Sequence, residues 1–158
     1  MTTTPVLTGR HIGEAENAIR ALLDRQLEEA SLSFPEWTVL LTLGGADPLP
    51  RSELVRRQAY GLKVSEAAAR ATVDGLRSSG LVAPVDEALD AGEPGGDAQD
   101  PRLTLTAAGQ ARFRPVRQAV LRIADELYGD LPPADLEATR RTLAEVTRRA
   151  NARLDAAG

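Results

Sequence analysis

The chain of 158 residues contains no cysteine and only one histidine, His11. Without cysteine it cannot form disulfide bonds, thiolate zinc sites or a cysteine nucleophile, and oxidants cannot act on it through a thiol. A single imidazole cannot supply a multi-histidine metal site within one subunit. Aromatic residues make up 3% of the chain, so leucine, valine, isoleucine and alanine must form most of its core. A core of that composition suits helices.

Long apolar runs are also missing, since the longest are a few residues, such as Val39–Leu41. A membrane-spanning helix needs about 20 apolar residues, so we expect no membrane span and no membrane partner. Residues 1–10 lack the basic and apolar segments of a secretory signal, which favours a cytoplasmic protein. No Walker or dinucleotide-binding loop is present, because the glycine-rich residues 92–96 are acidic. We therefore expect no cofactor, no metal site and no enzymatic activity.

The residues that are present fit a soluble, folded protein, with 42% hydrophobic and 27% charged side chains. The length fits one compact domain, or one domain with a dimerisation extension. The formal net charge is −4, yet the charge is unevenly distributed. Residues 51–85 carry a net charge of +3, whereas residues 86–101 carry −6. A negative total therefore does not exclude a local surface that binds anions.

The spacing of apolar residues predicts four helices in the first half of the chain. These helices are expected at residues 8–30, 35–44, 51–59 and 64–79. Thr8 and Ser65 should cap the first and the fourth, and Pro35 lies in the first turn of the second. The second should end at Gly44 and Gly45, and the third should stop near Gly61.

The middle of the chain predicts a small hairpin. Its two strands are expected at residues 81–85 and 102–105. Residues 46–50 should form a turn, and residues 86–101 are rich in glycine, proline and aspartate, which indicates a solvated loop. Thr106 should cap a long helix, in which Pro115 should kink the helix or loosen one turn. A last helix is expected after a short break that contains two prolines.

The first helix and the last two carry apolar stripes longer than the small central elements can cover. In the last helix the stripe recurs at near-heptad spacing, at Leu136, Leu143, Val146, Ala150 and Leu154. Such stripes need a partner, and a second copy of the chain supplies one by symmetry. The chain is therefore predicted to be a homodimer.

Three stretches of the sequence occur together in a known family of proteins. They are FPEWTVL at 34–40, VDGLRSSGLV at 73–82 and DPRLTLTAAG at 100–109. With these stretches the chain resembles, over about residues 8–155, the MarR family of bacterial winged helix-turn-helix regulators. The resemblance implies a mainly α fold with a small β-hairpin wing. It implies a winged helix-turn-helix DNA-binding domain at 34–105, and a helical dimerisation region formed by 1–33 and 106–158.

The resemblance implies a homodimeric transcriptional regulator, more often a repressor, that binds double-stranded DNA at a pseudo-palindromic operator. The fourth predicted helix would be the recognition helix, since at about 1.5 Å per residue it spans roughly 24 Å and fits a major groove about 12 Å wide. Ser65 would receive a phosphate, Arg70 would reach a guanine edge or a phosphate, and Arg102 would enter the minor groove or contact a phosphate. The candidate DNA-binding residues are Arg56, Arg57, Lys63, Ser65, Glu66, Ala68, Arg70, Arg77 and Arg102.

The resemblance also implies a ligand cleft between the dimerisation region and the DNA-binding domain. Four residues are candidates to contact a small aromatic or anionic effector there: His11, Arg20, Phe34 and Trp37. Each also has an ordinary structural explanation, because the histidine can pack in an interface, the aromatic rings in the core, and the arginine in a surface ion pair. An effector bound in this cleft would favour one spacing of the recognition helices over another.

The chain departs from the family pattern at three places. Pro84 stands where the family usually has an arginine, residues 86–101 are acidic where relatives commonly carry a basic wing tip, and Glu66 opposes phosphate. The arginines of residues 51–77 can also form an ordinary solvated face. A second interpretation therefore stays open, in which the chain is a MarR-like module that binds a ligand or a protein and has weak or lost DNA binding.

Overall fold

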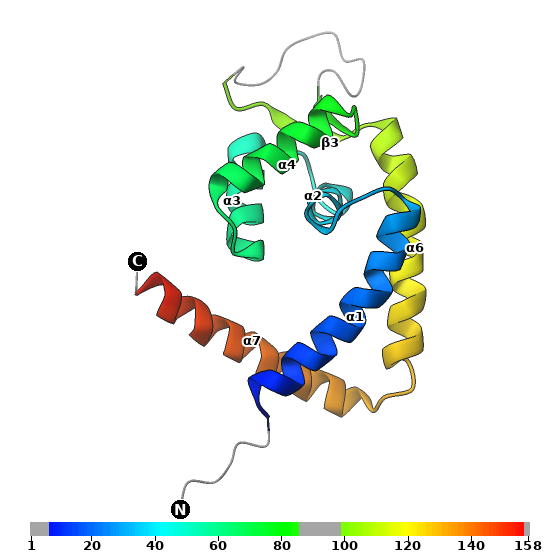
Figure 1. The fold of residues 1–158 in the computed structure, drawn as a ribbon, viewed down its shortest axis with the longest axis vertical. Coiled ribbons are helices and arrows are strands. Elements are labelled where there is room, and N and C mark those ends of the chain that lie inside the picture. Colours follow the sequence, from blue (N-terminus) through cyan, green and yellow to red (C-terminus); the bar gives the residue numbers. More distant parts are fainter. Residues whose placement is uncertain (1–6, 86–98, 157–158) are drawn as a thin grey trace, which may run out of the picture. The chain divides into compact units, whose positions relative to one another are not determined.

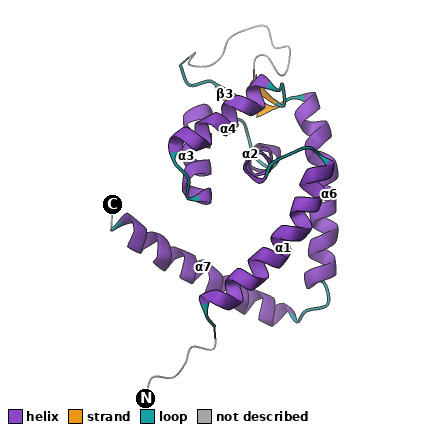
Figure 2. Cartoon of the chain, viewed as in Figure 1, coloured by secondary structure: helices purple, strands orange, loops and turns teal. Residues whose placement is uncertain are grey.

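The structure, a computed structural model, describes residues 7–85 and 99–156 (Figure 1). Within these ranges the chain contains six helices and three short strands. The helices are α1 (Gly9–Glu29), α2 (Phe34–Gly44), α3 (Arg51–Leu62), α4 (Glu66–Ser78), α6 (Ala107–Tyr128) and α7 (Pro133–Asp155). The strands are β1 (Leu49–Pro50), β2 (Val82–Pro84) and β3 (Arg102–Leu105). The predicted fold class, mainly helical with a small β wing, is confirmed (Figure 2).

The chain divides into two compact units, Met1–Val120 and Leu121–Gly158. The division falls inside α6, which continues across Pro115 as a helix. In the second unit, none of the residues of α7 is buried. Among the described helices, none is both long and apolar enough to cross a membrane.

The core of the first unit surrounds α2. Val39 and Leu40 are completely buried, and α2 contacts α1, α3, α4 and β3. The largest fully buried side chains are all aliphatic, as the composition predicts. One aromatic pair joins them, because Trp37 of α2 stacks on Phe113 of α6 with the ring centroids 5.5 Å apart. This packing fixes α3 and α4 on a rigid support.

The sheet has three antiparallel strands in the order β1–β3–β2. Leu49 pairs with Leu103, and Val82 pairs with Leu105. The prediction of a turn at residues 46–50 is wrong for Leu49 and Pro50, which form the edge strand β1. A strand of two residues has no alternation to detect. A proline is tolerated at a sheet edge because no neighbouring strand needs the N–H that it lacks.

Side-chain caps begin α2 and α4, and the cap of α4 is the predicted Ser65. Thr8 precedes α1, and Ser33 precedes α2 with its side chain accepting from the Glu36 N–H. Ser65 precedes α4, and its hydroxyl accepts a hydrogen bond from the Ala68 N–H at 3.2 Å. These contacts satisfy backbone donors that a helix start leaves without partners.

The end of α3 differs from the prediction. The helix includes Gly61 and stops at Leu62, near Gly61 as expected but three residues beyond the predicted range 51–59. A glycine inside a helix costs only about 1 kcal/mol, which tertiary packing readily overrides. Lys63 ends α3 instead, because its backbone is left-handed, with φ at 56°.

Two of the sequence stretches that carry the family resemblance contact each other directly. Thr106 caps α6, since its Oγ1 accepts from the Gly109 N–H at 3.0 Å, and the same hydroxyl donates to the Gly80 carbonyl at 2.7 Å. A Cβ on Gly109 would lie 2.0 Å from the Leu81 carbonyl oxygen. Gly80 itself has φ at +72°. Glycine and threonine at these positions therefore join the start of α6 to the end of α4.

Candidate nucleic-acid interface

Helices α3 and α4 pack side by side and form a helix-turn-helix, with the turn at residues 63–65 (Figure 1). One face of α4 is buried through Ala69, Val73 and Leu76. Most of the remaining α4 surface is exposed to solvent. Since the buried residues recur every three to four positions, the packing sets which side chains point outward.

A buried polar contact holds α3 on α2. Gln58 is the only buried polar side chain among the described residues. Its Nε2 donates to the Pro35 carbonyl and to Thr38 Oγ1, at 2.7 Å each. Because an unpaired buried amide would be costly, these bonds favour one position of α3.

The first two turns of α4 expose four candidate residues, Ser65, Glu66, Ala68 and Arg70. Arg70 Nη2 lies 4.0 Å from Glu66 Oε2, the longest ion pair of the helix-turn-helix, and the Arg70 side chain is 52% exposed. An exposed pair of this kind contributes little free energy, so Arg70 is available to a phosphate or a base edge. The start of α4 also presents the positive end of the helix dipole.

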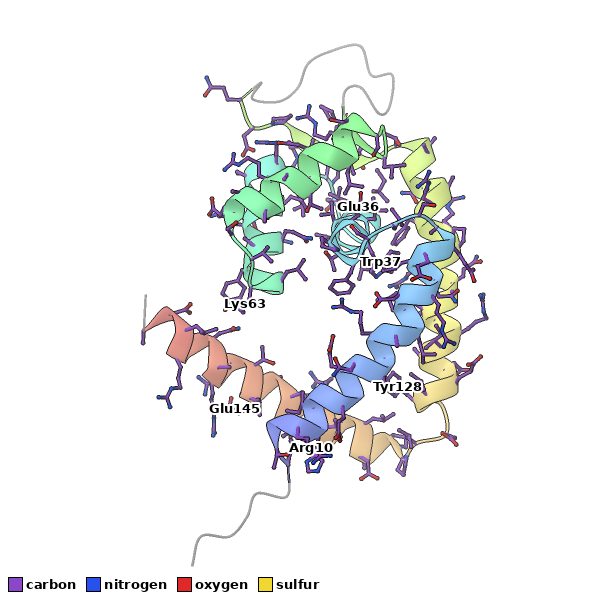
Figure 3. The ribbon with its side chains drawn as sticks, in the orientation of Figure 1. Arg10, Glu36, Trp37, Lys63, Tyr128 and Glu145 are labelled. Carbon is purple, nitrogen blue, oxygen red and sulfur yellow. The ribbon has the colours of Figure 1, made fainter. Side chains whose placement is uncertain are left out.

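Lys63 is exposed in the turn between α3 and α4 (Figure 3). Its Nζ lies 3.8 Å from the centroid of the Tyr60 ring. No carboxylate of the described residues lies within ion-pair distance of Lys63. The only lysine of the chain therefore lies near the start of α4 and has no acidic partner among the described residues.

Arg56 and Arg57 on α3 both pair with Glu53. Arg57 Nε donates to Glu53 Oε1 at 2.6 Å, and Arg56 donates to the other carboxylate oxygen. The Arg57 hydrogen bond, followed by those from Arg56, holds the pKa of Glu53 below its usual value, although partial desolvation opposes this shift. To contact DNA, these two arginines would have to break their ion pairs with Glu53, or bind a phosphate while they keep them.

Arg102 and Arg77 lie near the sheet. Arg102 is exposed on β3 and donates to the Pro48 carbonyl. Arg77 is half-buried at the end of α4. It lines an open pocket of about 640 Å³, together with Arg51, Asp74, Ser78, Gly80, Val82, Ala83 and Pro84. Arg77 is thus placed beside the sheet rather than beside Arg70, so the structure does not gather all the candidate residues in one cluster.

A polar network at the start of α3 was not among the sequence predictions. Arg51 pairs with Asp74 of α4, and Ser52 pairs with Asp100, which directly precedes Pro101 and β3. Asp100 lies in a bend before β3, as the predicted loop at 86–101 requires, but its carboxylate is bonded to Ser52, which the sequence does not predict. The partners lie 23 and 48 residues apart in the sequence, so no local sequence pattern predicts either contact. The rest of the predicted acidic loop, residues 86–98, lies outside the described residues.

The four candidate effector residues are only partly brought together. The Arg20 guanidinium carbon lies 3.3 Å from the centroid of the Phe34 ring, and both side chains are half-buried. Trp37, which is labelled in Figure 3, is buried and stacks on Phe113. His11 lies nine residues before Arg20, about 13.5 Å along α1, and its Nδ1 accepts from the Thr8 N–H at 3.2 Å.

Within the described ranges, no group of three or more histidine, cysteine, aspartate or glutamate side chains could hold a metal ion. Neither a protein-family model nor a curated protein sequence matches the chain. Solved structures do match it.

A MarR-family protein of Mycobacterium tuberculosis in complex with DNA is 19% identical, with a TM-score of 0.60, covering 91% of this chain and 98% of that one. The transcriptional repressor CouR bound to a 23-mer DNA duplex is 22% identical, with a TM-score of 0.67 and coverage of 89% and 92%. NadR in complex with 4-hydroxyphenylacetate is 20% identical, with a TM-score of 0.67 and coverage of 92% and 97%. The chain therefore has the fold of the MarR-family transcriptional regulators.

Proposed function

We propose that the chain is a transcriptional regulator that binds double-stranded DNA through α4. The observation that carries this proposal is the exposed first half of α4, which holds Arg70 in a loose ion pair on a buried scaffold. Lys63 adds a second cation at the adjacent turn. Two proteins of the same fold are bound to DNA in their solved structures, which supports this assignment.

We infer that the regulator acts as a homodimer. Helix α7 exposes an apolar row through Leu136, Leu143, Val146 and Leu154, with exposed fractions between 36% and 59%. Burial of apolar surface is worth about 25 cal/mol per Å², so a row of this length favours association. Two copies related by symmetry would present two α4 helices about 34–36 Å apart to a pseudo-palindromic operator.

We further infer that a small aromatic acid releases a repressor from its operator in the cytoplasm. Arg20 lies over the half-buried Phe34 ring, so a cation and an aromatic face are already adjacent. A protein of the same fold is in complex with 4-hydroxyphenylacetate, which carries both an aromatic ring and a carboxylate. The ligand would act by binding one spacing of the α4 helices more tightly than another.

The test is binding to duplex DNA from the region that flanks the gene, measured over a salt series. We expect the logarithm of the affinity to fall with the logarithm of salt concentration, with a slope of about −0.9 per phosphate contact. The Arg70→Ala, Arg102→Ala double variant should bind more weakly, whereas Arg114→Ala on the exposed face of α6 should bind as the unchanged protein does. Undiminished binding by the double variant would contradict this placement of the interface.

One observation favours a second function, a MarR-like module that binds a ligand or a protein without DNA. Glu53 forms ion pairs with both Arg56 and Arg57, and Glu66 is exposed at the start of α4. These carboxylates partly neutralise the positive charge of the candidate DNA-binding arginines. This function predicts no binding to the same duplex even at low salt. The salt series therefore separates the two functions.

A further inference from the structure

We propose that Arg51 is a positioning residue, which orients the recognition helix α4 against the base of the wing without contacting DNA. The inference rests on the proposed DNA-binding function and deepens it. Four side chains, Arg51, Ser52, Asp74 and Asp100, form the arrangement, which we call the clasp. They belong to the start of α3, to α4 and to the residue pair that leads into β3.

The backbone at the start of α3 depends on the wing for its hydrogen bonds. Pro50 occupies the N-cap position and has no side-chain acceptor. Asp100 takes that role instead, since its carboxylate accepts from the Ser52 N–H at 2.8 Å and from the Ser52 hydroxyl at 2.6 Å. The Arg51 N–H donates to the Pro101 carbonyl at 3.0 Å. Asp100 and Pro101, which directly precede β3, therefore accept hydrogen bonds from the first two backbone N–H groups of α3.

The charge of Asp100 fits this capping role. The hydrogen bond from the Ser52 hydroxyl, and then that from its N–H, hold the pKa of Asp100 below its usual value. A carboxylate at a helix start also interacts favourably with the helix dipole. Asp100 thus acts as an ionised cap on a helix that begins 49 residues earlier in the chain.

The side chain of Arg51 continues the connection to α4. Its Nη2 donates to both carboxylate oxygens of Asp74 at 2.7 Å, and its Nε donates to Oδ1 at 3.1 Å. The Arg51 side chain is only 21% exposed, and that of Asp74 is 45% exposed. A planar guanidinium that grips both oxygens fixes direction as well as distance.

The clasp therefore joins the two elements that the proposed function requires to contact DNA together. Arg51 and Ser52 bind the wing base through backbone and side chain, and Arg51 binds α4 through its guanidinium. Arg102, the candidate wing contact, follows Pro101 directly. Three of the Arg51 hydrogen bonds go to Asp74, so Arg51 is held in the protein, whereas Arg70 makes only a loose ion pair with Glu66.

The decisive variant is Asp74→Asn. Its effect on DNA affinity has opposite signs if Asp74 only repels phosphate and if Asp74 positions α4. Removing a carboxylate from a DNA-facing helix should strengthen binding if Asp74 merely repels phosphate. If the clasp positions α4, the same variant should weaken binding, on the order of tenfold. Arg51→Lys keeps the charge but loses the two-point grip, so it should weaken binding to a similar extent.

Three controls define the measurement. The salt slope of both variants should equal that of the unchanged protein, because neither variant removes a group that touches a phosphate. The double variant Arg51→Lys, Asp74→Asn should bind no more weakly than either single variant, since both remove one interaction. Arg114→Gln, which removes an exposed arginine of α6, should leave binding unchanged. Tighter binding by Asp74→Asn, or full binding by Arg51→Lys, would overturn the proposal.

Amide hydrogen exchange without DNA tests the clasp independently. We expect faster exchange in α4 and at the start of α3 in both variants, with α7 unchanged, well below the unfolding temperature. Exchange in α4 equal to that of the unchanged protein would overturn the clasp. If the unchanged protein does not bind the duplex, the proposed function fails, while the exchange measurement still decides the clasp.

Discussion

At the scale of single residues, close approach explains why glycine and threonine recur in the stretches that carry the resemblance. Gly109 is buried where α6 starts, and the Leu81 carbonyl oxygen occupies the space that a side chain would need. The Thr106 hydroxyl bonds across the same joint to the Gly80 carbonyl. The joint fixes the direction in which α6 leaves the winged helix-turn-helix.

Gly109→Ala should lower the free energy of unfolding by about 3 kcal/mol, because its Cβ would overlap a backbone oxygen. Gly75→Ala is the matched control, since a Cβ at this helical position meets no atom within 4 Å. It should instead stabilise the protein by about 1 kcal/mol, as alanine does in a helix. Urea unfolding of both variants measures the two effects, and a Gly109→Ala protein as stable as Gly75→Ala would contradict the joint.

Lys63 combines an unfavourable backbone with a proposed DNA contact. Its left-handed φ of 56° suits glycine, so Lys63→Gly should raise the free energy of unfolding by about 1 kcal/mol. The same variant should weaken DNA binding and make the salt slope shallower by about 0.9, the value for one phosphate. Lys63→Gln should weaken binding to the same extent without the gain in stability. A Lys63→Gly protein that binds DNA fully would show that the lysine does not touch the duplex.

At the scale of elements, the sequence predicts what depends on neighbouring residues. Apolar spacing locates the helices, and Ser65 marks the start of α4, because caps and stripes are local patterns. Contacts between distant residues give no such pattern. The short strand β1, the Arg51–Asp74 pair and the cap from Asp100 all arise only when the chain folds.

The candidate DNA-binding and effector sites also combine features that local patterns predict with contacts that arise only on folding. The exposed start of α4 could be predicted from the buried stripe on its other face, together with the family resemblance. The adjacency of Arg20 and Phe34 could not, because the two residues lie on different helices. No local pattern separates Arg51 from the other arginines of α3, which pair with Glu53 instead.

Helix α7 contains a charge cluster around Glu145, which pairs with Arg148 and Arg149 (Figure 3). Hydrogen bonds from Arg148 and then Arg149 lower the pKa of Glu145 to about 2. Because the folded pKa is depressed, the stabilisation is present above the ordinary value of 4.5 and is lost as pH falls through about 2.

Glu145→Gln should therefore be less stable than the unchanged protein at pH 7 and equally stable below pH 2. Thermal unfolding followed by circular dichroism at both pH values measures the difference. Glu126→Gln, which removes an exposed carboxylate that has no ion pair in the described structure, controls for the change in charge alone. A difference for Glu145→Gln that persists below pH 2 would contradict the pairing.

At the scale of the whole molecule, the exposed apolar row of α7 is expected to be covered by a second copy. Leu143→Glu places a charge in the middle of that row and should halve the mass measured by light scattering at micromolar concentration. The helical content should stay unchanged, because Leu143 is 39% exposed in the single chain. Ala152→Glu lies on the opposite side of α7 and should leave the mass unchanged. A monomeric unchanged protein would contradict the dimer.

The regulator assignment depends on two α4 helices meeting one face of a duplex, and hydroxyl-radical footprinting tests this directly. We expect two chains to protect two segments centred about 10 base pairs apart on the same face of the DNA. Leu143→Glu should abolish the paired pattern. A single protected segment bound by one chain, or no protection at any salt concentration, would contradict the assignment of the chain as a dimeric DNA-binding regulator.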